Sequence, residues 1–191
     1  MDRTKFLGGS DMGAILGCSK FKTKYELYLE KIGQMDSFKG NKNTEYGNMM
    51  EPVIGNMFVK EKGLKLEIPN PCYHDSEHDF LKAHLDYKVL GENVGVEIKN
   101  SGCMFLWDNI YDPIPEMYFA QVQFYMMITG WDKFYMCVFL GGSDIRIFNL
   151  ERDKWYIEMM RNKAISFWIN HVIPKKPPAI SSDDSDVLLN Q

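Results

Sequence analysis

The residues best suited to chemistry are two acids and a lysine that flank a predicted turn. Asp86 precedes the dipeptide Gly91-Glu92, and Glu97 and Lys99 follow it. If Gly91-Glu92 is a two-residue turn with glycine in the first central position, as a type II′ turn prefers, Asp86 lies directly opposite Glu97. The Cβ atoms of such a pair are about 5 Å apart. The sequence therefore predicts two carboxylates and a lysine on one face of a hairpin.

The apolar residues of the same stretch favour this register. A three-residue loop would set Asp86 against Ile98 and mix apolar and polar side chains on both faces. The two-residue turn instead separates them. It places one set on a wholly apolar face: Leu85, Tyr87, Val89, Val94, Val96 and Ile98.

Two opposed carboxylates destabilise a sheet unless a cation compensates them. Mg²⁺ is the expected cation because it prefers carboxylate and carbonyl oxygens, and Mn²⁺ is a possible substitute. A bound metal lowers the pKa of its water, and Lys99 can stabilise charge at phosphorus, as phosphodiester hydrolysis requires. The alternative is a solvated hairpin face on which Lys88 and Lys99 neighbour the acids by chance. Spacing alone does not decide between the two.

Composition predicts a soluble, intracellular protein with one domain. The chain has 191 residues, of which 45% are hydrophobic and 25% charged. No apolar run approaches the roughly 20 residues that span a bilayer, and the N-terminus lacks a signal-peptide stretch. The four cysteines are scattered and predict reduced thiols. With a net charge of -4, any contact with DNA must be local.

Helical and alternating patterns place these residues on elements of an α/β (α+β) domain with a mixed central sheet flanked by helices. We expect a single domain over 1–173 and a C-terminal strap with an acidic tail over 174–191. Pro52 should bend its helix or begin a new one, and Trp155 should lie on the apolar side of the last helix. The expected helices are 10–17, 23–33, 46–63, 116–129 and 151–171, and the expected strands lie within 64–99, 133–140 and 144–150.

An Asp followed by Glu-x-Lys on the next strand resembles the signature of the PD-(D/E)XK nucleases, whose core is that of restriction endonucleases. The flanking residues resemble the YqaJ-type viral recombinases, the group that includes lambda exonuclease. The resemblance extends from about Arg3 to His171. Its four motifs, in chain order, are Gly8 to Asp11 with Ala14 to Gly17, Gly47-Asn48 through Glu51-Pro52, Val96 to Lys99, and Tyr118 to Tyr125.

The resemblance implies a role for each candidate site residue. Asp86 and Glu97 would be metal ligands, with the Ile98 carbonyl as a possible third, and Lys99 would be the catalytic lysine. Glu51 would reach a second metal or its waters from its helix. In many relatives a glycine follows the metal-binding aspartate, whereas Tyr87 follows Asp86 here. Two upstream acids are candidates for a further ligand of a second metal: Asp75 and Asp79.

Four further residues are implied in orienting the active site or binding DNA. Gln121 and Tyr125 lie four residues apart and share a helix face, from which they would orient the active site or the DNA strand. Arg3 and Ser10 resemble the arginine and serine that bind the terminal 5′-phosphate in lambda-type enzymes. The serine lies at a predicted helix start, where backbone N–H groups favour anions.

The implied function is a metal-dependent 5′ to 3′ exonuclease on linear double-stranded DNA, which leaves a 3′ single strand for phage-type recombination. The resemblance also implies a trimeric ring around DNA, a single-strand annealing protein as partner, and the cytoplasm of a bacterial host if a phage or prophage encodes the chain. The alternatives are a structure- or site-specific endonuclease of the same fold and a non-catalytic module that binds DNA ends. The intact Glu51, Asp86, Glu97 and Lys99 argue against the last.

Overall fold

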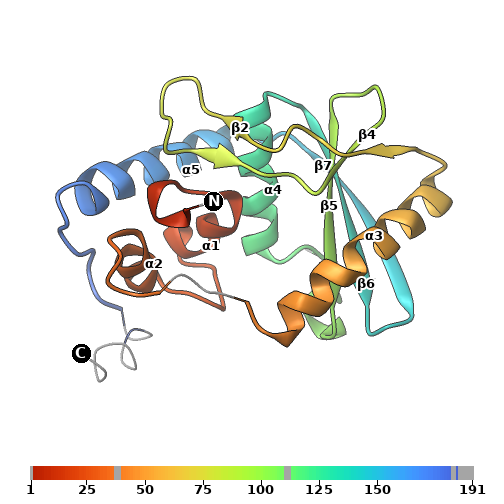
Figure 1. Cartoon of the computed structure of the whole chain (residues 1–191), viewed down its shortest axis with the longest axis horizontal. Coiled ribbons are helices and arrows are strands. Elements are labelled where there is room, and N and C mark those ends of the chain that lie inside the picture. The colour runs from red at the N-terminus through yellow and green to blue at the C-terminus, as the bar shows by residue number, and fades with distance from the viewer. Residues whose placement is uncertain (1, 37–39, 110–112, 182–183, 185–191) are drawn as a thin grey trace.

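A central sheet divides the molecule, and helices cover both of its faces (Figure 1). The computed structural model describes residues 2–36, 40–109, 113–181 and 184. The five strands of the sheet lie in the order β1-β4-β5-β6-β7. Only the β5 and β6 pairing is parallel, so the sheet is mixed, as expected. The strands are β1 (Leu66–Glu67), β4 (Tyr87–Val89), β5 (Val94–Ser101), β6 (Lys133–Leu140) and β7 (Asp144–Glu151). A separate two-stranded sheet consists of β2 (Tyr73–His74) and β3 (Lys82–Ala83).

The N-terminal region is a series of short turns followed by two helices. The 3-10 turns η1 (Arg3–Lys5) and η2 (Gly9–Asp11) lead into α1 (Met12–Leu16), which ends at Gly17 as predicted. At the start of η2, the Asp11 carboxylate accepts a hydrogen bond from the Gly8 backbone N–H. In α2 (Lys24–Lys31), Thr23 and Glu26 form a capping box that satisfies the first backbone donors.

The long helix α3 (Lys42–Lys62) crosses one face of the sheet (Figure 1). Asn41 caps its start and Gly63 ends it. Pro52 lies inside the helix and does not begin a new one. Ile54 and Phe58 are fully buried against the sheet. Their cluster includes Val89, Val96 and Ile98, which confirms that most of the predicted apolar face of the hairpin is buried.

The helix α4 (Glu116–Thr129) packs on the other face, against a larger hydrophobic cluster that also contains residues of α1, α2 and α5. Strand alternation directs successive β5 side chains to opposite faces. Val96 and Ile98 pair with Tyr135 and Cys137 under α3. Glu97 pairs with Met136, whose side chain belongs to the cluster under α4. The sequence pattern therefore placed Glu97 on the correct face.

The predicted hairpin register is confirmed, and its turn differs. Tyr87 pairs with Val96 and Lys88 with Gly95. Glu92 N donates to Val89 O at 3.1 Å, so Leu90 and Gly91 are the central turn residues, and Gly91 is the second of them. Gly91 has a φ of 77°, which only glycine adopts without strain. Leu85 was expected beside Ile98, but it belongs to the cluster on the opposite face because regular pairing stops at Tyr87.

The C-terminal elements complete the larger cluster. The 3-10 turn η3 (Met104–Trp107) follows β5, and α5 (Lys154–Phe167) continues as a π turn, η4 (Trp168–Val172). Trp168 stacks on Phe80, whereas Trp155 is 74% exposed. The expectation for Trp155 was wrong because it lies in the first turn of α5, before the helix meets the core at Ile157. Of the predicted tail, Asp184 is buried and accepts from Ser181.

In the parts of the chain that the structure describes, no helix combines the length and the apolar character needed to cross a membrane.

Candidate active site

A cavity of about 290 Å³ opens beside the C-terminal half of β5. It is formed where α3, α4 and the hairpin meet. It is lined by the five predicted catalytic residues and by Ile98, the predicted carbonyl ligand. Its lining residues are Thr44, Gly47, Asn48, Glu51, Asp86, Glu97, Ile98, Lys99, Asn100 and Gln121.

The early end of the β4 and β5 ladder exposes the edge of β5 to this cavity. Asp86 lies in a bend just before β4, where backbone pairing with β5 has stopped. Its Oδ2 accepts a hydrogen bond of 2.8 Å from Ile98 N, in place of a backbone carbonyl. The carboxylate is thus fixed beside Glu97 without being part of the regular pairing. Because the edge is open, side chains of α3 and α4 reach the same cavity from opposite faces.

Glu97, Lys99 and Gln121 form one connected group. Lys99 Nζ lies 2.6 Å from Glu97 Oε1 and donates to Gln121 Oε1 at 3.2 Å. Gln121 Nε2 donates to Glu97 Oε1 and to the Tyr125 hydroxyl, both at 2.7 Å. Lys99 also lies 5.1 Å from the centre of the Tyr118 ring. The amide of Gln121 therefore fixes the acid and the lysine together.

Among the described residues, no N–H or hydroxyl group donates to the other oxygen of Glu97. Glu97 is 2% exposed, and its Oε2 is buried without a hydrogen bond. Burial and the neighbouring Asp86 carboxylate raise the pKa of Glu97 to about 8, despite the opposing effect of Lys99. Burial also raises the pKa of Asp86, and burial together with Asp86 raises that of Glu51. Burial is the largest cause of all three shifts, and Lys99 does not offset it.

The donor set of the cavity fits a hard divalent cation. Glu51, Asp86 and Glu97 offer carboxylate oxygens, and Lys99 is the single cation among the lining residues. An unpartnered oxygen such as Glu97 Oε2 is costly unless something binds it. Burial lowers the pKa of Lys99, but Glu97 and Asp86 outweigh burial and raise it, so the lysine stays charged. One lysine cannot balance three acids, so a divalent ion would complete the site.

Asp75 and Asp79 do not line the cavity. Among the described residues, Asp75, Glu77 and His78 form the one group whose potential ligand atoms all lie within 4.8 Å of one another. Arg161 of α5 donates to all three, so that group already has its counter-charge. Asp79 is exposed and pairs with His74 and Lys82. Asp75 and Asp79, the two candidates for a further ligand of a second metal, therefore lie outside the cavity.

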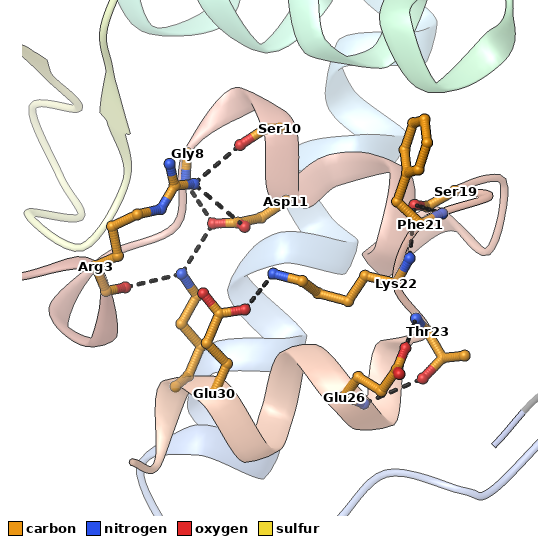
Figure 2. A network of polar contacts seen from close by, with 11 residues as sticks. Arg3, Gly8, Ser10, Asp11, Ser19, Phe21, Lys22, Thr23, Glu26 and Glu30 are labelled. Carbon is orange, nitrogen blue, oxygen red and sulfur yellow. Dashed lines mark hydrogen bonds and ion pairs between the residues drawn. The ribbon is translucent and has the colours of Figure 1, made fainter. Parts of the chain in front are cut away.

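Arg3 and Ser10 are in direct contact, as Figure 2 shows. Arg3 Nη2 donates to Ser10 Oγ at 2.9 Å and lies 3.6 Å from Asp11 Oδ1. Asp11 is 2% exposed and Lys31 is fully buried, and Lys31 Nζ lies 2.9 Å from Asp11 Oδ2. Burial raises the pKa of Asp11, but Lys31 and Arg3 outweigh it and the pKa is lowered. Asp11 is therefore an anion held between two cations.

The turn that carries Ser10 packs directly on the active-site helix. A Cβ atom built on Gly9 would lie 2.6 Å from Tyr125 Cε1 and 3.0 Å from Gln121 Cγ, so only glycine fits between them. Tyr125 is 5% exposed, with its hydroxyl bonded to Gln121. Tyr125 was expected to orient the active site or the DNA strand, and its burial beside Gln121 favours the first of these roles.

Sequence reasoning missed Asp11 and Lys31 as site residues. Asp11 was named only as part of the Gly8 to Asp11 motif. Lys31 was not singled out, because most lysines are expected to be exposed. A lysine at the inward-facing end of an amphipathic helix, in phase with Leu27 and Tyr28, was the available signal. The pocket residues Thr44 and Asn100 were also missed.

The chain is similar in sequence to known proteins. A family model described as the YqaJ-like viral recombinase domain matches residues 1–132. The uncharacterized protein YqaJ of Bacillus subtilis (strain 168) is 31% identical over 188 residues, or 97% of this chain. The chain spans 59% of the length of that relative.

Solved structures share the fold. The alkaline exonuclease LHK-Exo from Laribacter hongkongensis has a TM-score of 0.71 at 18% identity, over 88% of both chains. LHK-Exo in complex with dAMP has a TM-score of 0.74 at 16% identity, over 99% of this chain and 96% of that one. A phage-related exonuclease from Haemophilus somnus 129PT has a TM-score of 0.68 at 18% identity, over 85% and 91%. The fold is that of the PD-(D/E)XK phage-type exonucleases.

Proposed function

The chain belongs to the family of YqaJ-like viral recombinase domains, and from this premise we propose that it is a metal-dependent deoxyribonuclease that degrades linear double-stranded DNA from its 5′ ends. The observation that carries the proposal is the excess of acid beside Lys99. Glu51, Asp86 and Glu97 share one cavity with a single lysine, and Glu97 Oε2 is buried without a partner.

Asp86 and Glu97 would hold the metal, with the Ile98 carbonyl as a third ligand and Glu51 acting from the opposite wall. Mg²⁺ suits these oxygen donors, and Mn²⁺ would substitute for it. When bound, such an ion supplies Lewis-acid chemistry, which draws charge from the phosphodiester and makes water more acidic. The hydrogen bond from Ile98 N fixes the Asp86 carboxylate for this task.

Lys99 and Gln121 would act on the phosphodiester and the attacking water. The ammonium of Lys99 is held at the cavity by Glu97 and Gln121, so it meets the substrate already oriented. A fixed positive charge stabilises the pentavalent transition state, where negative charge on the phosphate oxygens increases. Gln121 shares Glu97 Oε1 with Lys99 and would set the position of both groups.

Arg3 and Ser10 would bind the terminal 5′-phosphate and so set the direction of degradation. Arg3 has a side-chain exposure of 45%, and Ser10 is exposed, so both reach solvent next to the turn that packs on Gln121. Capture of a 5′ end there would deliver it to the cavity and leave a 3′ single strand. A trimeric ring would confine DNA to a basic channel despite the net charge of -4. A single-strand annealing protein would use the product, in the cytoplasm of a bacterial host.

The test is digestion of linear duplex DNA with 5′-phosphate or 5′-hydroxyl ends, with Mg²⁺ or with a chelator. We expect metal-dependent degradation by the wild type and none by Glu97→Ala. Glu92→Ala, which removes an exposed acid from the turn of the same hairpin, is the matched control and should remain active. Activity in chelator, or full activity of Glu97→Ala, would contradict the mechanism.

Closed circular duplex DNA is the second substrate, because it has no ends. An exonuclease leaves it intact, whereas cutting of circles would indicate an endonuclease of the same fold. Equal rates on the two kinds of end would leave the nuclease in place but remove the role of Arg3 and Ser10.

A further inference from the structure

We propose that the buried Asp11 and Lys31 pair is a positioning device for DNA-end recognition, which fixes Arg3 and keeps its positive charge available to a terminal phosphate. The inference rests on the proposed function, in which Arg3 and Ser10 bind the 5′ end. It assigns a role to two residues that never touch DNA.

Lys31 contacts the backbone of Arg3 directly and its guanidinium through Asp11. Its Nζ donates to the Arg3 backbone carbonyl at 2.9 Å and, at the same distance, to Asp11 Oδ2. Asp11 Oδ2 also accepts from Gly8 N at 3.0 Å, and Asp11 Oδ1 lies 3.6 Å from Arg3 Nη2. One lysine at the end of α2 therefore anchors the backbone of η1 and, through Asp11, the guanidinium that η1 carries (Figure 2).

The charges in this cluster explain why Lys31 is needed. Without Lys31, Asp11 would pair with Arg3 alone and neutralise the positive charge that must attract phosphate. Lys31 supplies a second cation to Asp11. Its side chain is fully buried, so it cannot itself reach DNA. The neighbouring Glu30 also acts on Lys31, but it is paired with Lys22. The Asp11 carboxylate therefore faces two cations, and these three groups keep one net positive charge. That charge lies on Arg3, the member with 45% side-chain exposure.

Fixing the arginine also reduces the cost of binding. A free arginine side chain loses rotamer entropy when its guanidinium binds an anion. The contacts with Asp11, Ser10 and Lys31 order Arg3 in advance, so a phosphate meets a preorganised donor.

The test compares cleavage of 5′-phosphate and 5′-hydroxyl duplex ends by Lys31→Met, Lys31→Gln and the double variant Asp11→Asn/Lys31→Met. We expect either single variant to lower the phosphate-to-hydroxyl rate ratio about tenfold, because Asp11 then neutralises Arg3. The double variant should recover much of the ratio, because the competing carboxylate is gone. Binding of the 5′-phosphorylated duplex in chelator should follow the same order without any catalysis.

Lys22→Met is the matched control. Lys22 lies ahead of α2 and pairs with Glu30, a buried acid near the end of that helix, and its ammonium points to Glu30, away from Arg3 (Figure 2). This variant should lose stability and leave the rate ratio unchanged. Lys31→Gln keeps a polar donor, so it serves if Lys31→Met does not fold.

Two results would overturn the inference and leave the proposed function intact. One is a wild-type phosphate-to-hydroxyl rate ratio in the Lys31 variants, and the other is a ratio in the double variant that is no higher than in Lys31→Met. If the wild type itself does not distinguish the two kinds of end, the proposed role of Arg3 and Ser10 fails and the inference fails with it. Loss of activity on both ends by the same factor would reduce the pair to a purely structural role and would also overturn it.

Discussion

The catalytic cavity and the N-terminal cluster of Arg3, Ser10, Asp11 and Lys31 are both built around buried acids, but their charge balance is opposite. In the cavity three carboxylates face one lysine, and a buried oxygen of Glu97 has no partner. In the N-terminal cluster one carboxylate faces two cations, and Asp11 Oδ2 accepts two hydrogen bonds. Each imbalance indicates the ligand that would correct it.

Under the proposed function, the opposite charge balance would give one fold two kinds of site, one for a cation and one for an anion. The acid-rich cavity favours a divalent ion, whose charge would lower the pKa of Glu97 from about 8. The cation-rich cluster favours a phosphate. The two regions meet at Gly9, which packs on Gln121 and Tyr125. A DNA end bound to the cluster would thus be presented next to the cavity.

Replacing Glu97 should have the largest effect. Glu97→Gln removes a metal ligand while keeping its size, and we expect a loss of activity of at least about 10³-fold. Without metal, stability should change little below pH 8, where Glu97 is already neutral, and rise above it, where an ionised Glu97 would oppose Asp86. Glu30→Gln changes an equally buried acid that is paired with Lys22. This variant should lose stability and keep its activity. Cleavage rates and thermal unfolding in chelator measure both. A Glu97 variant that unfolds at a lower temperature than the wild type yet stays active would contradict the comparison.

Lys99→Met should lower cleavage by about 10²- to 10³-fold, because the transition state loses a fixed positive charge. Metal affinity should rise, since Lys99 no longer competes for Glu97 Oε1. Calorimetric titration with Mg²⁺ or Mn²⁺ tests this. Lys88→Met removes a lysine that pairs with Glu67 outside the cavity and should change neither quantity. Weaker metal binding by Lys99→Met would mean that the lysine supports the site in some other way.

Gly9→Ala should act on the boundary between the two regions. The added methyl would lie 2.6 Å from the Tyr125 ring and push Gln121 from its place, so we expect about a tenfold loss of activity. Overpacking should also cost about 1–3 kcal/mol of stability. Gly8→Ala is the matched control, because its nearest neighbour would be 3.7 Å away. Equal activity of the two variants would show that the contact with Gln121 does not matter.

The smallest expected effect is a pH dependence of the metal-free protein. Glu97 has a folded-state pKa of about 8, above its ordinary value, so the fold binds a proton that the unfolded chain releases. Stability from this group is greatest at acidic pH and is lost as pH rises through about 8. Metal binding should therefore strengthen over the same range, because it must displace that proton. Thermal unfolding with and without Mg²⁺ tests the sign, with Glu97→Gln expected to flatten the slope.

Much of the fold could be predicted because it depends on local patterns. The bounds of α4 and β6 match the expected ranges, since strong periodicity and a terminal glycine or turn define them. The hairpin register was also predicted, because a slip of one residue would have exposed its apolar face. Trp155 and the turn at Gly91 were assigned wrongly, since neither depends on periodicity: one depends on where a helix meets the core, the other on which backbone groups bond.

The sequence by itself determined which side chains share a strand face: Glu97 and Lys99 on one face of β5, Val96 and Ile98 on the other. Strand geometry forces that alternation whatever the rest of the chain does. Only the tertiary structure decided that β4 leaves β5 at Asp86, so that α3 and α4 reach one cavity. It also decided that Lys31 lies under Arg3. Such contacts join segments far apart in the chain, and burial, which sets their charge balance and pKa values, exists only once those segments have packed.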